Sequence, residues 1–391
     1  MDLAAAEPAS SSSPAASALL PVYDQLDVEP VAGDGVWLET VDGRCLLDFY
    51  GGHAVALLGY RHPRLLAALA AQAERLFFQS NAVPLAVRER AARKLAAFAP
   101  DGLGTVFFVN SGAEANENAL RLALRTAGRP RIVALEGAFH GRTAAAAAVT
   151  WKARWYGFPR APFDVRFVPR EDAAALATAL APGDVAAVIL EPVQGVAGAI
   201  EISDAFLAEA RRLTSESGAL LIFDEVQCGM GRCGAPFVAQ AAGVTPDLLT
   251  TAKGLAGGFP AGALLVSDAV AATVHPGDLG STFGGGPLAC ALVEATLDAI
   301  DEEHVLANVA ARAAEIRVRC RVGPVTAIGG RGLLVGLRTT RPAKQVQREL
   351  LETGILVGTS ADPNVVRLLP PLTIGADHVE MLAGALAELP A

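Results

Sequence analysis

Short apolar runs that alternate with longer helix-like stretches are the feature that most constrains how this chain can fold. Each run is too short for an ordinary helix and is rich in Val, Ile, Leu and Phe, so each predicts a buried strand. The predicted strands are Thr105–Asn110, Arg131–Leu135, Val165–Val168, Val185–Leu190, Ala219–Phe223, Asp247–Thr251 and Gly262–Val266. Helix-like stretches separate several of them, which favours a mostly parallel sheet covered by helices on both faces. These helices are expected at Ala113–Thr126, Ala173–Leu180 and Asp204–Ser217.

The two ends of the chain show a different pattern. Gly35–Thr40 and Cys45–Asp48 flank a short turn and predict a hairpin outside the main sheet. After about residue 290 comes a long helical pattern, followed by short strands around Gly332–Leu337 and Val365–Leu368 and a last helix. We therefore predict an α/β protein with a disordered tail (1–20), an N-terminal segment that joins the small domain (21–60), a large domain (61–290) and a small α+β domain (291–391).

Composition excludes several classes of function. The 391 residues carry 41 acidic and 32 basic side chains, and this acidic balance argues against non-specific nucleic-acid binding. Only 19% of residues are charged, below the roughly 25% of an ordinary domain, which favours either a membrane protein or a large subunit interface. The longest charge-free stretches, Pro8–Tyr23 and Leu279–Val293, are broken by Ser, Pro or Gly, so we expect no membrane span and a homo-oligomer.

The cysteines and the first residues bear on the compartment. The five cysteines have no zinc or redox spacing, so we expect reduced thiols and no metal site. No Lys or Arg precedes Arg44, which is not the pattern of a secretory or transit peptide. We therefore expect a cytoplasmic protein.

Two ionisable residues follow predicted strands directly. Asp224 follows Ala219–Phe223, and Lys253 follows Asp247–Thr251. A carboxylate at the end of a buried strand is costly to desolvate unless a partner meets it, although a lone Asp there is more often a helix cap or an ion-pair member. A buried amine has a lowered pKa, as a lysine that forms an imine requires, although a single Lys is usually a solvated surface residue.

Other strand ends carry possible binding groups. Ser111, Gly112 and Ala113 open a helix whose free N–H groups suit an anion, but Ser111 and Glu114 also fit an ordinary capping box. Phe139 could stack on a flat ring and Arg142 could grip a carboxylate, although the first is usually core and the second usually solvated. Thr282 offers a hydroxyl in a Gly-rich loop that could equally be a mobile linker.

The combination is more informative than any single residue. Ligands of open α/β sheets bind beyond the carboxyl ends of the strands, and all these groups follow strands of one predicted sheet. An anion seat, an aromatic ring, a carboxylate and a reactive lysine are the four requirements of a phosphorylated pyridinium aldehyde.

These residues resemble the class III (ω-) aminotransferases, which are fold-type I pyridoxal 5'-phosphate enzymes. The resemblance runs from about residue 28 to the C-terminus, and within the class it is greatest to the members that act on acetylornithine. It implies a large PLP-binding domain and a smaller domain built from both chain ends. The segments that carry it are Asn110–Asn116 (NSGAEAN), Phe139–Thr143 (FHGRT), Leu190–Gly195 (LEPVQG), Ile222–Gln227 (IFDEVQ) and Ala252–Gly254 (AKG).

The resemblance implies a role for each residue around the cofactor ring. Lys253 would form the covalent imine and then act as general acid and base, and Asp224 would keep the pyridine nitrogen protonated. Val226 and Phe139 would sandwich the ring, and Gln227 would contact its phenolic oxygen.

The resemblance also implies how the phosphate is held. Ser111, Gly112 and Ala113 would bind it within one subunit. Ser281 and Thr282 would reach the phosphate of the neighbouring subunit, so the expected homodimer would share its active sites.

Three further residues would bind substrate on the same grounds. Arg142 and Arg367 would hold the carboxylates of the amino donor and of 2-oxoglutarate or glutamate, and Glu191 would lie close to the substrate pocket. The implied reaction converts N-acetylornithine and 2-oxoglutarate to N-acetylglutamate 5-semialdehyde and glutamate, a step of arginine biosynthesis.

One position departs from the family pattern. Most relatives carry a glutamate in the loop where this chain has Val196, and that glutamate pairs with the C-terminal arginine while the ω-amino donor is bound. With Val196 in place, we expect either that another acid masks Arg367 or that Arg367 permanently holds a carboxylate.

The alternative functions differ in whether they retain transamination. Another donor would keep it: succinylornithine, succinyldiaminopimelate, a carrier-linked lysine, ornithine or 4-aminobutyrate. A catalytically silent scaffold relative would have lost the lysine, the aspartate or the phosphate seat, and this chain has all three. A dehydrogenase would need a Gly-x-Gly-x-x-Gly turn in the first βα unit, which is not found in that context.

Overall fold

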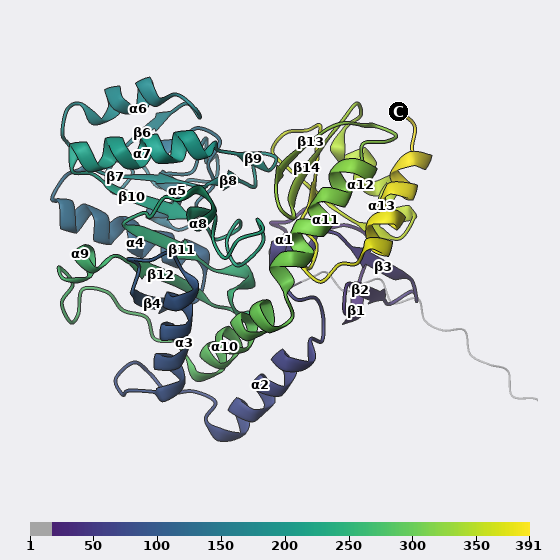
Figure 1. Cartoon of the computed structure of the whole chain (residues 1–391), viewed down its shortest axis with the longest axis horizontal. Coiled ribbons are helices and arrows are strands. Elements are labelled where there is room, and N and C mark those ends of the chain that lie inside the picture. The colour runs from purple at the N-terminus through teal and green to yellow at the C-terminus, as the bar shows by residue number, and fades with distance from the viewer. Residues whose placement is uncertain (1–17) are drawn as a thin grey trace, which may run out of the picture.

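The computed structural model describes residues 18–391, and it is built around a seven-stranded sheet (Figure 1). The predicted tail, residues 1–20, lies mostly outside the described residues. The strand order is β4-β12-β11-β10-β7-β5-β6, and only β12 runs antiparallel to its neighbours. The strands are β4 (Thr105–Val109), β5 (Arg131–Leu135), β6 (Asp164–Val168), β7 (Val185–Leu190), β10 (Leu220–Asp224), β11 (Leu248–Thr251) and β12 (Gly262–Val266). All seven predicted strands are therefore confirmed, with ends that differ by one residue at most.

Helices cover both faces of this sheet because alternate side chains of each strand point to opposite sides. Ile132 and Ala134 of β5 pack in one apolar cluster with α4 and α5, whereas Val133 and Leu135 pack in the other cluster with α6, α7 and α8. The helices that accompany the sheet are α2 (Pro63–Arg75), α3 (Ala86–Phe98), α4 (Gly112–Ala127), α5 (Ala144–Ala148), α6 (Ala173–Leu180), α7 (Asp204–Ser217), α8 (Val238–Ala242) and α9 (Asp268–Ala271).

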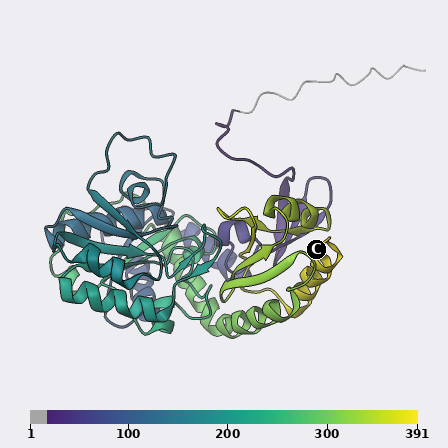
Figure 2. The same cartoon turned by 90° about the horizontal axis from the view of Figure 1, so that it is seen from above.

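The chain ends form a second lobe beside the sheet (Figure 2). The predicted hairpin is present, and a strand from the C-terminal part, β15, extends it by pairing in parallel with β3. Nearby lies a four-stranded sheet of order β13-β14-β17-β16. The strands are β1 (Pro30–Asp34), β2 (Trp37–Thr40), β3 (Cys45–Asp48), β13 (Val325–Arg331), β14 (Leu334–Thr339), β15 (Ile355–Leu356), β16 (Gly358–Thr359) and β17 (Val365–Leu368).

The helices of this lobe include the long pair that follows the main sheet. Helix α10 packs against α2 and α3 and runs through the predicted boundary at residue 290, and α11 continues into the second lobe. Val379, Leu382 and Leu386 of the last helix are buried, as the periodicity predicts. These elements are α1 (Gly51–Ala54), α10 (Pro287–Glu302), α11 (Val305–Arg319), α12 (Ala343–Glu352) and α13 (Ala376–Glu388).

The remaining elements lie next to the main sheet's carboxyl edge or bridge the two lobes. A short ladder pairs β8 (Val193–Gln194) with β9 (Ile200–Glu201), and the 3₁₀ helix η1 (Lys253–Ala256) follows β11. None of the helices within residues 18–391 is both long and apolar enough to cross a membrane.

Candidate active site

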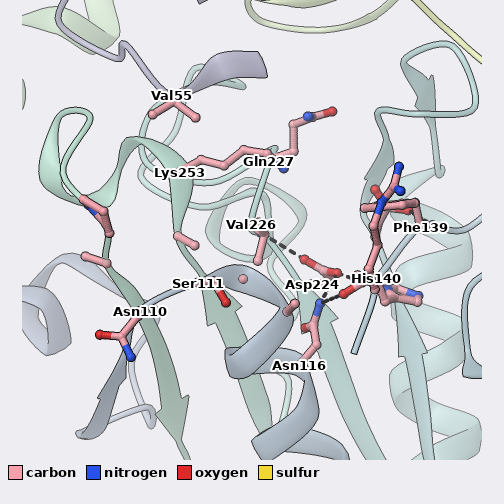
Figure 3. A pocket seen from close by; sticks show the side chains of 18 of the residues that line it. Val55, Asn110, Ser111, Asn116, Phe139, His140, Asp224, Val226, Gln227 and Lys253 are labelled. Carbon is pink, nitrogen blue, oxygen red and sulfur yellow. Dashed lines mark hydrogen bonds and ion pairs between the residues drawn. The ribbon is translucent and has the colours of Figure 1, made fainter. Parts of the chain in front are cut away.

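A cavity of about 510 Å³ lies at the carboxyl edge of the seven-stranded sheet. That volume is typical of a site for a small molecule. Its walls come from the residues that follow β4, β5, β7, β10 and β11, together with residues that precede the antiparallel β12. Ten predicted residues line it: Ser111, Gly112, Ala113, Phe139, Arg142, Glu191, Asp224, Val226, Gln227 and Lys253. Figure 3 shows several of them around the pocket, with Lys253 near the top and Asp224 and its partners lower down.

Asp224 is held by a buried hydrogen-bond network. It ends β10 and is only 3% exposed. Its Oδ2 lies 2.7 Å from His140 Nδ1 and accepts a hydrogen bond of 2.7 Å from Asn116 Nδ2, and its Oδ1 accepts from the Val226 backbone N–H at 3.0 Å. Thr250 donates in turn to the Asn116 side-chain oxygen at 2.7 Å. The carboxylate is thereby fixed in orientation, which explains how a charge can be buried at this strand end.

The sequence did not predict the two side chains that orient the Asp224 carboxylate. His140 belongs to the FHGRT segment and is 2% exposed, and Asn116 ends the NSGAEAN segment and is 1% exposed. A buried His and a buried Asn need partners, so their burial identifies them, but burial is not visible in the sequence. Asn116 follows Gly112 by four residues and so shares its helix face, which is the one signal that could have located it.

Lys253 begins the 3₁₀ helix that follows β11. Its φ is +50°, in the left-handed region that a residue with a side chain rarely adopts. Such strain is concentrated at functional sites. The protein packed around the side chain lowers the pKa of the amine, while Asp224 and Glu191 act in the opposite direction. The amine is therefore easier to deprotonate than a surface lysine, as an imine-forming lysine requires.

The N-terminus of α4 forms the opposite side of the cavity. Ser111 is its N-cap and accepts a hydrogen bond of 3.1 Å from the Glu114 N–H. The Glu114 carboxylate accepts from the Asn110 N–H rather than from the Ser111 N–H, so the predicted capping box is shifted by one residue. No backbone acceptor within the described chain takes the Gly112 and Ala113 N–H groups. These two N–H groups are therefore available to an anion.

Val226 and Phe139 both line the cavity. A Cβ at position 112 would lie 2.5 Å from Val226 Cγ1, so Gly112 is what allows Val226 to approach the helix start. The Phe139 N–H donates a hydrogen bond of 2.8 Å to Glu191 Oε1, which fixes the backbone that carries the ring. Burial, together with the nearby Asp224, raises the pKa of Glu191 from 4.5 to about 7, and His140 acts in the opposite direction.

Arg367 lies on β17 of the second lobe, behind the cavity wall. It is 5% exposed, donates 2.7 Å from Nε to the Thr359 carbonyl and lies 3.5 Å from Gln227 Oε1 through Nη1. Burial lowers the pKa of its guanidinium. Within residues 18–391 no carboxylate forms an ion pair with it, so the expected masking acid is not found there.

Val196 lines the same cavity. Its backbone carbonyl accepts a hydrogen bond of 2.8 Å from Ala361, which connects this loop to the second lobe. Its side chain supplies no charge that could pair with Arg367.

Ser281 and Thr282 do not line the cavity of this chain. Ser281 Oγ accepts a hydrogen bond from Asn110 at 3.3 Å, and Thr282 and Phe283 are exposed. Their contact with a neighbouring subunit stays a prediction.

The residues present fit pyridoxal phosphate. One cavity contains an amine with a lowered pKa, a hydrogen-bonded buried carboxylate, two apolar side chains and two free N–H groups at a helix start. These groups match the aldehyde, the ring nitrogen, the ring faces and the phosphate of that molecule. Within the described residues, no three His, Cys, Asp or Glu side chains are grouped to hold a metal ion.

Comparison with known families agrees with this geometry. The family model described as aminotransferase class-III matches residues 21–389. The chain belongs to the class-III aminotransferases. It is 44% identical to the acetylornithine aminotransferase of Streptomyces coelicolor, an alignment that covers 91% of this chain and 89% of the relative. It is 43% identical to the acetylornithine aminotransferase of Methanopyrus kandleri, with 94% of each chain covered.

Solved structures show the same fold. The N-acetylornithine aminotransferase of Stenotrophomonas maltophilia superposes with a TM-score of 0.79 at 33% identity, over 93% of this chain and 96% of that one. An ornithine aminotransferase of Toxoplasma gondii, in which PLP partly occupies the active site, superposes with a TM-score of 0.87 at 30% identity, over 93% and 90%. The predicted fold-type I architecture is therefore confirmed.

Proposed function

We propose that this aminotransferase transfers the amino group of N-acetylornithine to 2-oxoglutarate, a step of arginine biosynthesis. The observation that carries the transamination is the single cavity that joins the Lys253 amine, the buried Asp224 carboxylate and the open N-terminus of α4. The choice of donor is supported by the relatives named above. They are acetylornithine aminotransferases, and this chain aligns with nearly their whole length.

Each residue around the cofactor would have a separate role in the reaction. Pyridoxal phosphate, when bound, supplies a ring that stabilises negative charge on the carbon that loses a proton. Lys253, with its lowered pKa, would take the proton from the amine-bearing carbon of the substrate and deliver it to the former aldehyde carbon of the cofactor, which is the 1,3-proton transfer that transamination requires. Asp224 would hold a proton at the ring nitrogen, and the Gly112 and Ala113 N–H groups with the Ser111 hydroxyl would bind the phosphate. Val226 and Phe139 would pack on the two ring faces, and Gln227 would contact the phenolic oxygen.

Two arginines suit substrates that carry carboxylates. Arg142 lines the cavity, and Arg367 lies behind Gln227. A dicarboxylate such as 2-oxoglutarate could use both, whereas N-acetylornithine has one carboxylate, far from its reacting amine. We assign that carboxylate to Arg142 because Arg142 is the more exposed of the two. Glu191 would act on the same region by fixing the Phe139 backbone.

We also propose a cytoplasmic homodimer with shared active sites. The exposed Phe283, whose ring centroid lies 5.2 Å from that of the exposed Phe78, supports an interface beside Ser281 and Thr282. Burial of such rings by a second copy would bring those two hydroxyls near its phosphate seat.

A donor panel tests the proposal. The purified, cofactor-loaded protein is given 2-oxoglutarate with N-acetylornithine, ornithine, 4-aminobutyrate or succinylornithine, and glutamate formation is measured. We expect kcat/KM for N-acetylornithine to exceed that for each other donor by at least about tenfold, since a site built for one donor loses that much for each missing good contact. A higher kcat/KM with any other donor would overturn the substrate assignment while leaving the transaminase chemistry intact.

One observation favours a second donor, succinyldiaminopimelate. Its reacting carbon carries its own carboxylate, which would suit an Arg367 that has no acidic partner in the described chain. Val196→Glu sharpens the choice. If Arg367 normally holds a donor carboxylate, the added acid should compete with it and lower kcat/KM for succinyldiaminopimelate several-fold while sparing N-acetylornithine. Equal effects on both donors would exclude a role for position 196 in choosing between them.

A further inference from the structure

Arg142 differs from most arginines of this protein in what it touches. Arg131 is paired with Asp184 at 2.6 Å, and Arg212 with Glu216 at 2.5 Å. Within residues 18–391 Arg142 makes no hydrogen bond or ion pair, and its guanidinium lies over an aromatic ring. Its guanidinium carbon lies 4.9 Å from the centroid of the Trp155 ring, within the range of a cation–π interaction.

Trp155 is itself attached to the cavity wall. It lies in the segment between α5 and β6, and its ring centroid is 6.0 Å from that of Phe139, with the planes tilted by 52°. Phe139 is fixed in turn by the hydrogen bond from its N–H to Glu191. A continuous series of contacts therefore runs from the buried Glu191 through two rings to Arg142 at the mouth of the cavity.

The type of partner matters for carboxylate binding. A carboxylate partner would occupy the N–H edge of the guanidinium and neutralise its charge. An aromatic partner does not neutralise the charge, and Arg142 donates no hydrogen bond within residues 18–391, so its N–H donors and positive charge stay available while the ring restricts the side chain. Trp155 is 44% exposed, so an incoming substrate can also cover part of its ring.

We propose that Trp155 is a positioning residue that holds the Arg142 guanidinium ready for the substrate's distal carboxylate and so selects carboxylate-bearing substrates. This inference rests on the proposed function only in assigning a carboxylate to Arg142. It does not depend on which amine is the donor.

The experiment measures the binding of glutarate, a dicarboxylate without an amine, to the cofactor-loaded protein by calorimetry. Trp155→Leu removes the ring face and should raise the Kd of glutarate and the KM of N-acetylornithine by about two- to fivefold, the range of an exposed cation–π contact. The kcat and the cofactor's visible absorbance should stay unchanged. Trp155→Phe should raise the Kd of glutarate less than Trp155→Leu does, and Arg142→Ala should raise it more.

Two controls separate positioning from mere support of the loop. Lys152→Gln removes the neighbouring cation–π pair with Trp151, whose distance is 5.1 Å, and should leave glutarate binding unchanged. The inhibition constant of 1,5-diaminopentane, which has no carboxylate, should not respond to Trp155→Leu. Three results would each overturn the inference. The first is that Trp155→Leu weakens the binding of glutarate and of 1,5-diaminopentane equally, and the second is that Trp155→Phe and Trp155→Leu raise the Kd of glutarate equally. The third is that Trp155→Leu leaves the Kd of glutarate unchanged. If N-acetylornithine is not turned over but glutarate binding still depends on Trp155, the proposed donor fails and this inference stands.

Discussion

At the deep end of the cavity Asp224 is 3% exposed and is contacted by His140, Asn116 and a backbone N–H, whereas at the mouth Arg142 is exposed and is contacted by one half-exposed ring. The deep end is a polar network whose members are all buried, so the loss of one leaves another without a partner. The mouth is held by a single contact in solvent. We conclude that substitutions at the deep end should affect chemistry and cofactor binding strongly, and those at the mouth should affect substrate affinity modestly.

The largest effect should follow from removing the amine. Lys253→Ala should lower kcat by at least about 10³-fold, because acid–base catalysis and covalent attachment of the cofactor are both lost. Steady-state glutamate formation measures the rate, and borohydride reduction followed by peptide mass analysis measures attachment. Lys253→Arg keeps the charge but cannot form the imine, so it should fail as well. Turnover near wild type in either variant would remove Lys253 from its proposed role.

The second-largest effect should follow from a change in the hydrogen-bond network around the Asp224 carboxylate. Asp224→Asn should weaken cofactor binding by about 10²-fold or more, since breaking a buried charge pair costs roughly 3–5 kcal/mol. Fluorescence titration with the cofactor measures it. Asp247→Asn is the matched control, because Asp247 also adjoins a strand of the sheet but pairs with Arg211 at 2.8 Å outside the cavity. Similar cofactor affinities in the two variants would contradict the special importance of the carboxylate at the deep end of the cavity.

A third test concerns Glu191, the buried acid that accepts a hydrogen bond from the Phe139 backbone N–H. The pKa of Glu191 is raised from 4.5 to about 7, so the folded state favours the protonated acid and loses stability as the pH rises from about 4.5 to about 7. Glu191→Gln keeps the acceptor for Phe139 and removes the charge. Its free energy of unfolding should exceed that of wild type by up to about 3 kcal/mol at pH 8, with little difference at pH 4.5. Denaturant titrations at both pH values measure this, and a pH-independent difference would contradict the buried charge.

The smallest effect should occur at the mouth. Arg142→Ala should raise the KM of N-acetylornithine by about tenfold, since a charge-assisted contact to a carboxylate is lost, while cofactor absorbance and the melting temperature stay unchanged. Initial rates over a range of donor concentrations measure it. An equal loss with an amine that has no carboxylate would show that Arg142 supports the wall rather than the substrate.

The sequence predicted much of this arrangement because its signals are local. Apolar runs located all seven strands of the main sheet, and the polar residues directly after them, such as Asp224 and Lys253, had to emerge at its carboxyl edge. The family resemblance added the expected roles, which stay predictions until they are tested. The strands β1 and β13 were not predicted, because their largely exposed residues lack a continuous apolar run.

Only the tertiary structure decided which side chains meet. His140 and Asp224 are 84 residues apart, and Gln227 and Arg367 are 140 apart, so no periodicity along the chain relates them. Their contacts arise because parallel strands and the two lobes bring distant segments to one edge. The same holds for Trp155, which the sequence leaves as one aromatic residue in a connecting segment and whose ring the fold places beneath the Arg142 guanidinium. Local pattern determines which elements form, whereas side-chain partners depend on how those elements pack.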